Sequence, residues 1–258
     1  MQSLIEEVFR LSANKVWPES HTQQTGAKPT DEELAQRIVF YLERAMFEDF
    51  GELMILAGNG MGIGAKKTLR SMYERLVTAM FIAKYPAEAR IFLRHADIEK
   101  GKVLNRALAV VPELVSKDFT PEEIQKIQEQ KKAAEAQKKI EYCDECKQPK
   151  TDEAWTRVNL DAMATKVDEG LFNLYGACYL SPTLLTHATP FGLDLRFRTP
   201  DQTVLHERYA HGSLWRAHLL MLSLLRHQDS YFNLGVTKEI DARSSAFSAI
   251  WPDDAEAS

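Results

Sequence analysis

Apolar side chains recur every three or four residues along most of this chain, and that spacing is typical of amphipathic helices. The first long run covers residues 31–56. Thr30 followed by Glu33 forms a capping box, so we expect this helix to begin directly after Thr30. A second run covers residues 65–84 with the same spacing. The pattern therefore predicts a pair of long helices in the first third of the chain.

Helical spacing continues through most of the remaining sequence. A third run starts with Pro86 in its first turn and is interrupted only by Gly101. The segment "VLHERYAHGSLWRAHLLMLSLLRHQ" is apolar nearly all round, so we expect it at the centre of the core. Before it, the short alternation "LDLRFR" in a proline-rich stretch favours a β-hairpin near residues 191–199. The fold class predicted is an all-α, multi-helix bundle.

Four alternate glycines in "GNGMGIGAKKT" resemble a phosphate-binding loop at first sight. The P-loop template fails, because Ala65 stands where the second glycine belongs and an extra lysine precedes Thr68. The shorter dinucleotide template fits, but it requires flanking strands, and both flanks have helical spacing. We therefore expect these glycines to end one helix and turn the chain into the next.

A charged segment divides the helical pattern. Thr120 and Glu123 form a second capping box, and glutamine, lysine and glutamate then dominate to residue 150. We expect a solvated helical arm of residues 120–150, with a coiled-coil partner or a nucleic-acid contact as the alternatives. The predicted organisation is an N-terminal helix and linker (1–30), a helical core (31–235) carrying this arm, and a C-terminal segment (236–258) with a frayed tail.

Composition narrows the functional classes. A net charge of −5 argues against a protein that wraps nucleic acid with a broadly basic surface. The N-terminus lacks the basic start and apolar run of a signal peptide, and no stretch approaches the roughly 18 apolar residues of a membrane span. We therefore expect a soluble, cytoplasmic protein without a membrane partner. RNA or a protein is the expected partner of the arm, and self-association stays open.

Three cysteines are too few for a disulfide scaffold, so we expect reduced thiols. Cys143 and Cys146 have the spacing of half a zinc site, but the sequence offers no second pair of ligands. The alternative without a metal is a pair of reduced cysteines at the end of the arm. The histidines show no metal-binding spacing either. We expect neither a metal nor a cofactor.

Two short arrangements carry candidate chemistry. Arg70 and Glu74 are one helical turn apart on a face that becomes increasingly apolar, which favours a partly buried ion pair. Arg90 and His95 match R-x4-H, one spelling of the motif of the HEPN ribonucleases, which are helical proteins of toxin and phage-defence systems. Such chemistry needs an arginine on the scissile phosphate and a histidine that moves protons. A motif this short also arises by chance.

The order of several segments resembles a known family. An R-x-x-x-E helix, a helix with ring and basic residues, a charged helix, a tryptophan and then "LYGACYLSPTLLTH" follow one another over residues 35–190. This order resembles the uncharacterised, mostly bacterial helical proteins of domain-of-unknown-function family 5677. The corresponding residues here are Arg70, Glu74, His95, Lys100, Trp155, Tyr175, Tyr179, Ser181 and His187. The resemblance implies a helical fold and a residue set without an assigned reaction.

Two functional hypotheses follow. In the first, the protein is a metal-independent HEPN-like endoribonuclease of a defence or toxin system, with Arg70 or Arg90 on the phosphate and His95 or His187 moving protons. Glu74 completes the catalytic set, and the expected ligand-binding residues are Arg90, Lys100, Tyr175, Tyr179 and Ser181. In the second, it is a non-catalytic interaction or regulatory domain that binds a protein or small ligand, and Arg70 and Glu74 form a structural ion pair.

Overall fold

The computed structural model describes residues 2–17, 28–137, 155–156, 158–186, 189–198 and 201–251. They form two compact units, each described by itself. The first comprises residues 1–86 and 160–258, and the second comprises residues 87–159. In the described ranges every regular element is a helix, which confirms the all-α prediction.

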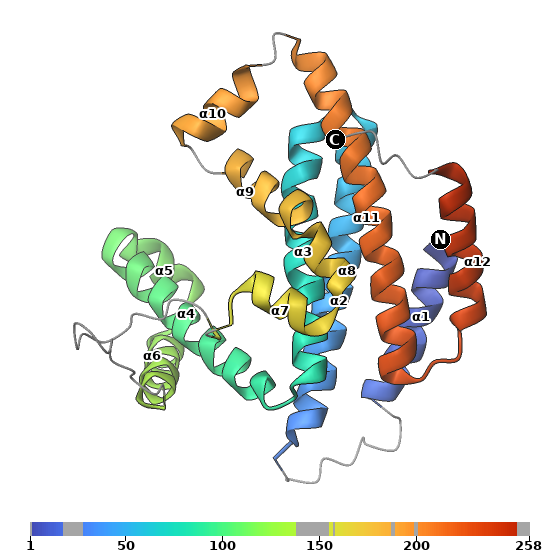
Figure 1. Cartoon of the computed structure of the whole chain (residues 1–258). Coiled ribbons are helices and arrows are strands. Elements are labelled where there is room, and N and C mark those ends of the chain that lie inside the picture. Colours follow the sequence, from blue (N-terminus) through green and yellow to red (C-terminus); the bar gives the residue numbers. More distant parts are fainter. Residues whose placement is uncertain are drawn as a thin grey trace, which may run out of the picture. The chain divides into compact units, whose positions relative to one another are not determined.

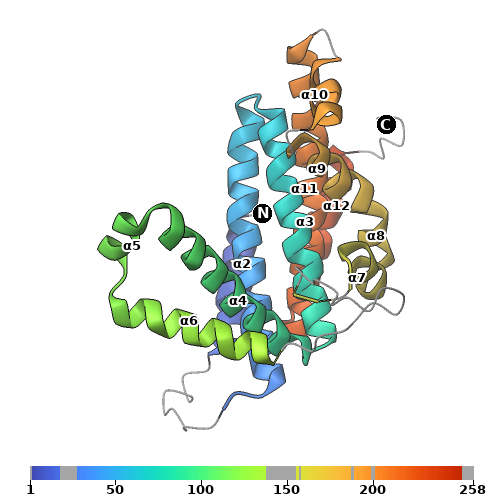
Figure 2. The ribbon, with the colours of Figure 1, turned by 90° about the vertical axis from the view of Figure 1, so that its left-hand side faces the viewer.

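Three long helices make the frame of the first unit, and they lie side by side in both views (Figures 1 and 2). They are α2 (Asp31–Gly58), α3 (Gly62–Lys84) and α11 (Gln202–Phe232). Helix α3 lies between the other two and buries Leu69, Met72 and Leu76 almost completely. Each fully buried side chain of this size contributes roughly 1.5–3 kcal/mol, so this three-helix contact dominates the stability of the unit.

Shorter helices cover the frame. Helices α1 (Gln2–Val16) and α12 (Thr237–Ile250) pack on α11, and α1 also contacts α2. Along α3 run three shorter α-helices and one π-helical turn: α7 (Leu160–Val167), α8 (Glu169–Tyr175), η2 (Gly176–Leu180) and α9 (Ser181–Thr186). The last of the covering helices, α10 (Pro190–Phe197), packs on α9.

The glycine-rich turn between α2 and α3 behaves as the sequence predicts. Helix α2 begins at the Thr30 capping box and ends at Gly58, and Gly60 then takes the left-handed backbone conformation with φ of +71°. Gly62 has a different role, because a Cβ atom there would lie 2.0 Å from the carbonyl oxygen of His206. The turn therefore needs one glycine for its backbone angle and another for the close approach of α11.

The second unit consists of α4 (Glu88–Val110), α5 (Pro112–Asp118) and α6 (Pro121–Ala136). The predicted interruption at Gly101 is wrong, because α4 runs through this residue without a break. Gly101 instead gives α6 room, since a Cβ atom there would lie 2.6 Å from the Cβ atom of Lys131. Leu104, Val115 and Ile127 form the small core that joins the three helices.

The charged arm begins as predicted and then packs more than expected. Thr120 caps α6 through both hydrogen bonds of the capping box with Glu123. Most side chains of α6 are exposed, but Ile127 and Ala134 are buried, and the helix lies along α4. Residues 138–150 of the predicted arm lie outside the described residues.

The β-hairpin predicted near residues 191–199 is wrong, because residues Pro190–Phe197 form helix α10. Thr189 accepts a hydrogen bond from the backbone N–H of Gly192, and Pro190 occupies the first helical position, so the start is well capped. Arg198 and Asp194 form an ion pair of 2.7 Å one helical turn apart. Three alternating pairs are too short a pattern to override these local helix signals.

None of the described helices combines the length and the apolar character that a membrane span requires.

Candidate functional site

Polar and aromatic side chains follow one stripe of α3 inside the first unit. Lys66, Arg70 and Tyr73 are spaced by four and three residues, which places them on one helical face. Arg70 donates to Glu74 through both Nε and Nη2, at 3.1 and 3.0 Å from the same carboxylate oxygen. The two side chains are 23% and 38% exposed, so the pair is partly buried as the sequence predicts.

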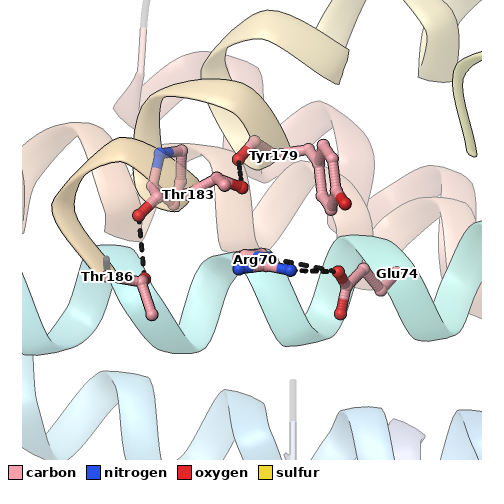
Figure 3. A network of polar contacts seen from close by, with 6 residues as sticks. Arg70, Glu74, Tyr179, Thr183 and Thr186 are labelled. Atoms are coloured by element: carbon pink, nitrogen blue, oxygen red, sulfur yellow. Dashed lines mark hydrogen bonds and ion pairs between the residues drawn. The ribbon is translucent and has the colours of Figure 1, made fainter. Parts of the chain in front are cut away.

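One tyrosine covers the arginine of this pair, and a second tyrosine stacks on the first. The Arg70 guanidinium carbon lies 4.9 Å from the centre of the Tyr179 ring, in cation–π geometry. Tyr175 stacks on Tyr179 at 5.2 Å with an interplanar angle of 24°. Figure 3 shows the Tyr179 ring reaching from its own helix toward the Arg70–Glu74 pair on α3. The structure thus brings together four of the residues that the sequence singled out.

The π-helical turn η2 carries Tyr179 and the buried Cys178. Its wider winding shows in the backbone N–H of Ser181, which donates to the carbonyl of Gly176 five residues earlier. The turn then returns to α-helical winding, where Thr183 Oγ1 donates to the Tyr179 carbonyl at 2.6 Å (Figure 3). Single π-turns inside helical segments occur frequently at functional sites, because they redirect a few side chains.

Tyr73 anchors the covering helices to α3. Its side chain is fully buried, and its hydroxyl donates to the carbonyl of Leu171 at 2.8 Å. Burial raises the pKa of Tyr73 above its ordinary value, and the neighbouring Cys178, Tyr175 and Asp161 add to the shift. The phenol therefore stays protonated and serves as a structural donor.

At the other end of the stripe, Lys66 lies against α11 and within the electrostatic influence of Arg216. Lys66 Nζ lies 4.6 Å from the centre of the Tyr209 ring on α11. Burial and then the positive charge of Arg216 lower the pKa of Lys66 to about 8, while Cys178 opposes the shift. Burial raises the pKa of the Cys178 thiol to about 12, so this sulfur stays protonated and adds no negative charge near neutral pH.

The partner stripe on α11 consists of Tyr209, Ser213 and Arg216, again spaced by four and three residues. Arg216 Nη1 donates to the carbonyl of Gly212 at 3.0 Å, whereas its buried Nε has no hydrogen-bond partner. Ser213 is 2% exposed, and its hydroxyl also lacks a partner. We call Lys66, Tyr209, Ser213, Arg216 and Cys178 the Lys66–Arg216 site.

Carboxylates are missing from this end of the stripe. Within the described part of the chain, neither Lys66 nor Arg216 forms an ion pair with an acidic side chain. Two acids near the other end of the stripe act on other groups, since Glu74 holds Arg70 and the charge of Asp161 acts on Tyr73 and Tyr175. Partly buried cations without a counter-ion, beside unpartnered donors, form an arrangement that suits an anion.

The remaining predicted residues lie elsewhere. Arg90, His95 and Lys100 are on α4 in the second unit, and His95 Nε2 lies 3.7 Å from Glu99. Five helical residues correspond to about 140° around the axis, so Arg90 and His95 are on different faces of α4. Ser181 is the first residue of α9. Their proposed roles stay predictions.

Three of the residues predicted from the sequence fall outside the part of the chain that the structure describes. His187, Cys143 and Cys146 all lie outside the described residues. Across the described ranges, no three histidine, cysteine or acidic side chains lie close enough to hold a metal ion.

Sequence reasoning missed most of the Lys66–Arg216 site. Lys66 belongs to the P-loop template that the sequence does not satisfy. Tyr209, Ser213 and Arg216 lie in the segment that the pattern describes as apolar nearly all round. A signal was present, because three polar or aromatic positions at i, i+4 and i+7 mark one stripe of that helix. That stripe faces the lysine of α3 only once the two helices pack.

A second buried polar contact lies between α2 and α11. Glu43 is completely buried, and its Oε1 lies 2.6 Å from Nδ1 of His227. The ring of Tyr231 stacks on His227 at 5.5 Å with an angle of 11°. Burial and then the Glu43 charge raise the pKa of Tyr231 to about 12. This contact holds two frame helices in register.

The geometry defines an all-α helical protein with a polar, cation-rich site between α3, α11 and the π-helical turn. A sequence model of a family of unknown function, DUF5677, matches residues 36–204, and the chain belongs to this family. The match includes Lys66, Arg70 and Tyr179 but ends before Ser213 and Arg216. No curated protein and no solved structure matches the chain.

Proposed function

We propose that the protein binds an anionic, phosphate-bearing small ligand at the Lys66–Arg216 site. One observation carries the proposal: one and two turns along α11 from Tyr209, whose ring Lys66 contacts, the Ser213 hydroxyl and Arg216 Nε are buried without a hydrogen-bond partner. In the described part of the chain no carboxylate forms an ion pair with Lys66 or Arg216, and the charge of Arg216 lowers the pKa of Lys66. This is the second of the two functional classes that the sequence left open, a non-catalytic helical domain that binds a ligand.

Electrostatics supports an anion there. Two like charges in a partly desolvated place repel each other, and a phosphate between them turns that repulsion into two attractive contacts. The unpartnered Ser213 hydroxyl and Arg216 Nε are the donors that such a group needs, and charge-assisted hydrogen bonds are the stronger kind. Helix packing already holds these donors in place, so little ordering entropy is lost on binding.

Arg70 and Glu74 have a supporting role in this proposal. Their pair is closed on itself by two hydrogen bonds and covered by the Tyr179 ring. It fixes the π-helical turn against α3 and so positions Cys178 beside the cations. The structural reading of this pair thus fits the binding function without assigning it any chemistry.

Thermal unfolding in inorganic phosphate tests the proposal. A ligand that binds only the folded state raises the free energy of unfolding, by about 2.7 kcal/mol at a hundred times its Kd, and so raises the midpoint temperature. We expect this stabilisation in the wild type and in the control Lys67→Met, whose lysine is exposed. It should be lost in Lys66→Met and in Arg216→Met. Equal stabilisation of all four proteins would refute the site.

Ribonuclease activity of the HEPN type, in a defence or toxin system, is the second candidate. The observation that favours it is the same pair of cations, which would neutralise a scissile phosphate. With a pKa of about 8, Lys66 also exchanges its proton near neutral pH. For proton transfer this candidate keeps the histidines predicted from the sequence, of which His95 lies in the second unit and His187 lies outside the described residues, so neither is placed at the Lys66–Arg216 site.

Cleavage of labelled RNA decides between the two candidates. The ribonuclease mechanism predicts cleavage by the wild type and a loss of at least about a hundredfold in His95→Ala or His187→Ala. Cleavage that persists in both variants contradicts the assigned histidines. Phosphate binding without any cleavage would support the binding function and contradict the ribonuclease function. Contacts of the charged arm with RNA or a protein stay a separate prediction.

A further inference from the structure

We propose that helix α4 pairs with α4 of a second copy of this chain, in antiparallel orientation, through a stripe of apolar side chains. The inference concerns the second unit alone and is independent of the anion site proposed above. One observation carries it: Val103 and Val110 are 68% and 71% exposed, although they belong to a regular apolar pattern on a long helix.

Helix α4 has two apolar faces. Helix α6 packs on the first face, where Ile98, Gly101 and Leu104 are buried (Figure 2). The second face lies about 130° further around the helix axis. It consists of five apolar side chains and one lysine, which we call the α4 stripe: Leu93, Ala96, Lys100, Val103, Ala107 and Val110. Ala107 is partly buried against the small core of the unit, and the other five are exposed.

The spacing of the α4 stripe is that of a coiled coil. Its members follow one another at intervals of 3, 4, 3, 4 and 3 residues, so they occupy alternating a and d positions of a heptad. Side chains at these positions insert between four residues of a facing helix that has the same spacing, as a second α4 does. Because the stripe is only about 27 Å long, we expect a weak dimer whose population depends on protein concentration.

Lys100 decides between the two orientations of such a pair, because it occupies an a position near the middle of the stripe. In a parallel pair equal positions face each other, so the two Lys100 ammonium groups would meet in one layer and repel each other. In an antiparallel pair Lys100 faces Val103 of the other copy, and its ammonium group extends past that side chain to solvent. The remaining layers then pair apolar residues, Leu93 with Val110 and Ala96 with Ala107.

The charges beside the stripe also fit the antiparallel orientation. Glu99 and Arg106 border the stripe, and Glu99 is 46% exposed although it also binds Lys102 on its own helix. In the antiparallel register Glu99 of each copy faces Arg106 of the other, and the twofold axis repeats this contact. The parallel register places Glu99 near Leu104, which is buried in the core of its own unit. Charge complementarity therefore argues for a second copy in the antiparallel orientation.

Sedimentation equilibrium of the full-length protein tests the pairing. We expect the weight-average mass to rise from 29.4 kDa toward twice that value as the concentration rises. Lys100→Leu should lower the dissociation constant at least about tenfold, because it adds apolar burial at the central a position. Val103→Lys should raise this constant at least about tenfold, because it sets a like charge against Lys100 of the other copy. Ile55→Lys is the control, since Ile55 on α2 is also 68% exposed, and it should leave the constant unchanged.

An exchange of charges tests the orientation. Glu99→Arg and Arg106→Glu should each weaken the dimer, because each sets two like charges against each other. The double variant restores the contact with its charges reversed, so its dissociation constant should return to within about threefold of the wild-type value. Circular dichroism of each variant confirms that it is folded before its mass is compared.

Each result decides one part of the inference. A mass of 29.4 kDa for both the wild type and Lys100→Leu, at concentrations up to about 1 mM, overturns the pairing and leaves the α4 stripe to a partner of another kind. A dimer that Val103→Lys and Ile55→Lys affect equally overturns its assignment to α4. A dimer that the exchange of charges fails to restore overturns the antiparallel orientation. Phosphate stabilisation by the first unit is measured separately and does not depend on these results.

Discussion

At the scale of single residues, the positions that matter most are those where one atom decides whether two helices can meet. Gly62 is such a position, because α11 passes with its backbone against the glycine Cα. Lys66 lies one turn further along α3, so the same close approach that needs Gly62 also brings Tyr209 over the lysine. Packing at a small residue therefore sets the geometry of the site.

Gly62→Ala tests this dependence. The added methyl group collides with the backbone of His206 at 2.0 Å and cannot move aside, so we expect a loss of about 2 kcal/mol in the free energy of unfolding. Gly58→Ala is the control, because a Cβ atom at this helical position meets nothing within 4 Å. Denaturant unfolding measures both, and equal losses would contradict the close approach.

Another residue-scale prediction concerns the buried contact of Glu43 with His227. His227→Ala leaves the Glu43 carboxylate buried without its partner, and we expect a loss of about 3 kcal/mol or more. Adding Glu43→Gln should recover part of the loss, because no charge then remains buried. Arg198→Ala, which removes an exposed pair, should cost less than about 1 kcal/mol. A similar cost for both single variants would argue against a buried pair.

Some residues of the candidate site could be predicted from the sequence, and others could not. The Arg70–Glu74 pair was predictable, because residues one helical turn apart meet wherever a helix forms. Tyr175 and Tyr179 came from the family resemblance. The contact of Lys66 with Tyr209 on the Arg216 stripe was not predictable, because it requires a particular face of α3 to meet a particular face of α11.

At the scale of elements, local signals located most helices. Both capping boxes form with both of their hydrogen bonds, because all partners lie within four residues of each other. The errors arose where local and tertiary effects compete. A glycine lowers helix stability locally, but Gly101 lies inside α4 because its missing side chain leaves room for α6 to pack there. The alternating pattern of residues 193–198 does not produce strands, because the Thr189 cap and Pro190 favour a helix start.

The capping box of α6 predicts how the stability contributed by Glu123 changes with pH. The backbone N–H and then the hydroxyl of Thr120 hydrogen-bond Glu123 and lower its pKa. A depressed pKa means stability that is present above the ordinary glutamate pKa of about 4.3 and lost as pH falls through the folded value. Thr120→Ala removes the hydroxyl alone, so we expect the Glu123 pKa to rise partway toward normal in an NMR titration. An unchanged titration would rule out the hydroxyl contribution.

At the scale of the whole molecule, the pKa of Lys66 couples binding to stability. Its folded value of about 8 lies below the ordinary value of about 10.4, so the unfolded chain holds more protons between these limits. The stability of the ligand-free protein should therefore gain from this group as pH rises through that window. Stabilisation by an anion should fall over the same range, because Lys66 loses its charge.

Unfolding with and without sulfate, whose charge stays constant over this range, measures both trends. In Lys66→Met, the free energy of unfolding should depend less on pH between about 8 and about 10.4 than in the wild type. The stabilisation by sulfate should show no dependence on pH over this range in that variant. Trends in the variant that match the wild type would show that another group titrates there.

The sequence by itself determined the all-α class, the helix starts at Thr30 and Thr120, the turn at Gly60 and the Arg70–Glu74 pair. Each of these depends on residues a few positions apart, whose geometry is the same in any helix. Only the tertiary structure decided which stripes meet: it brought the Lys66 stripe of α3 to the Arg216 stripe of α11, near a buried thiol, and among the described residues no acid forms an ion pair with either cation. Residues this far apart in the chain come together through packing, and sequence spacing alone does not specify packing.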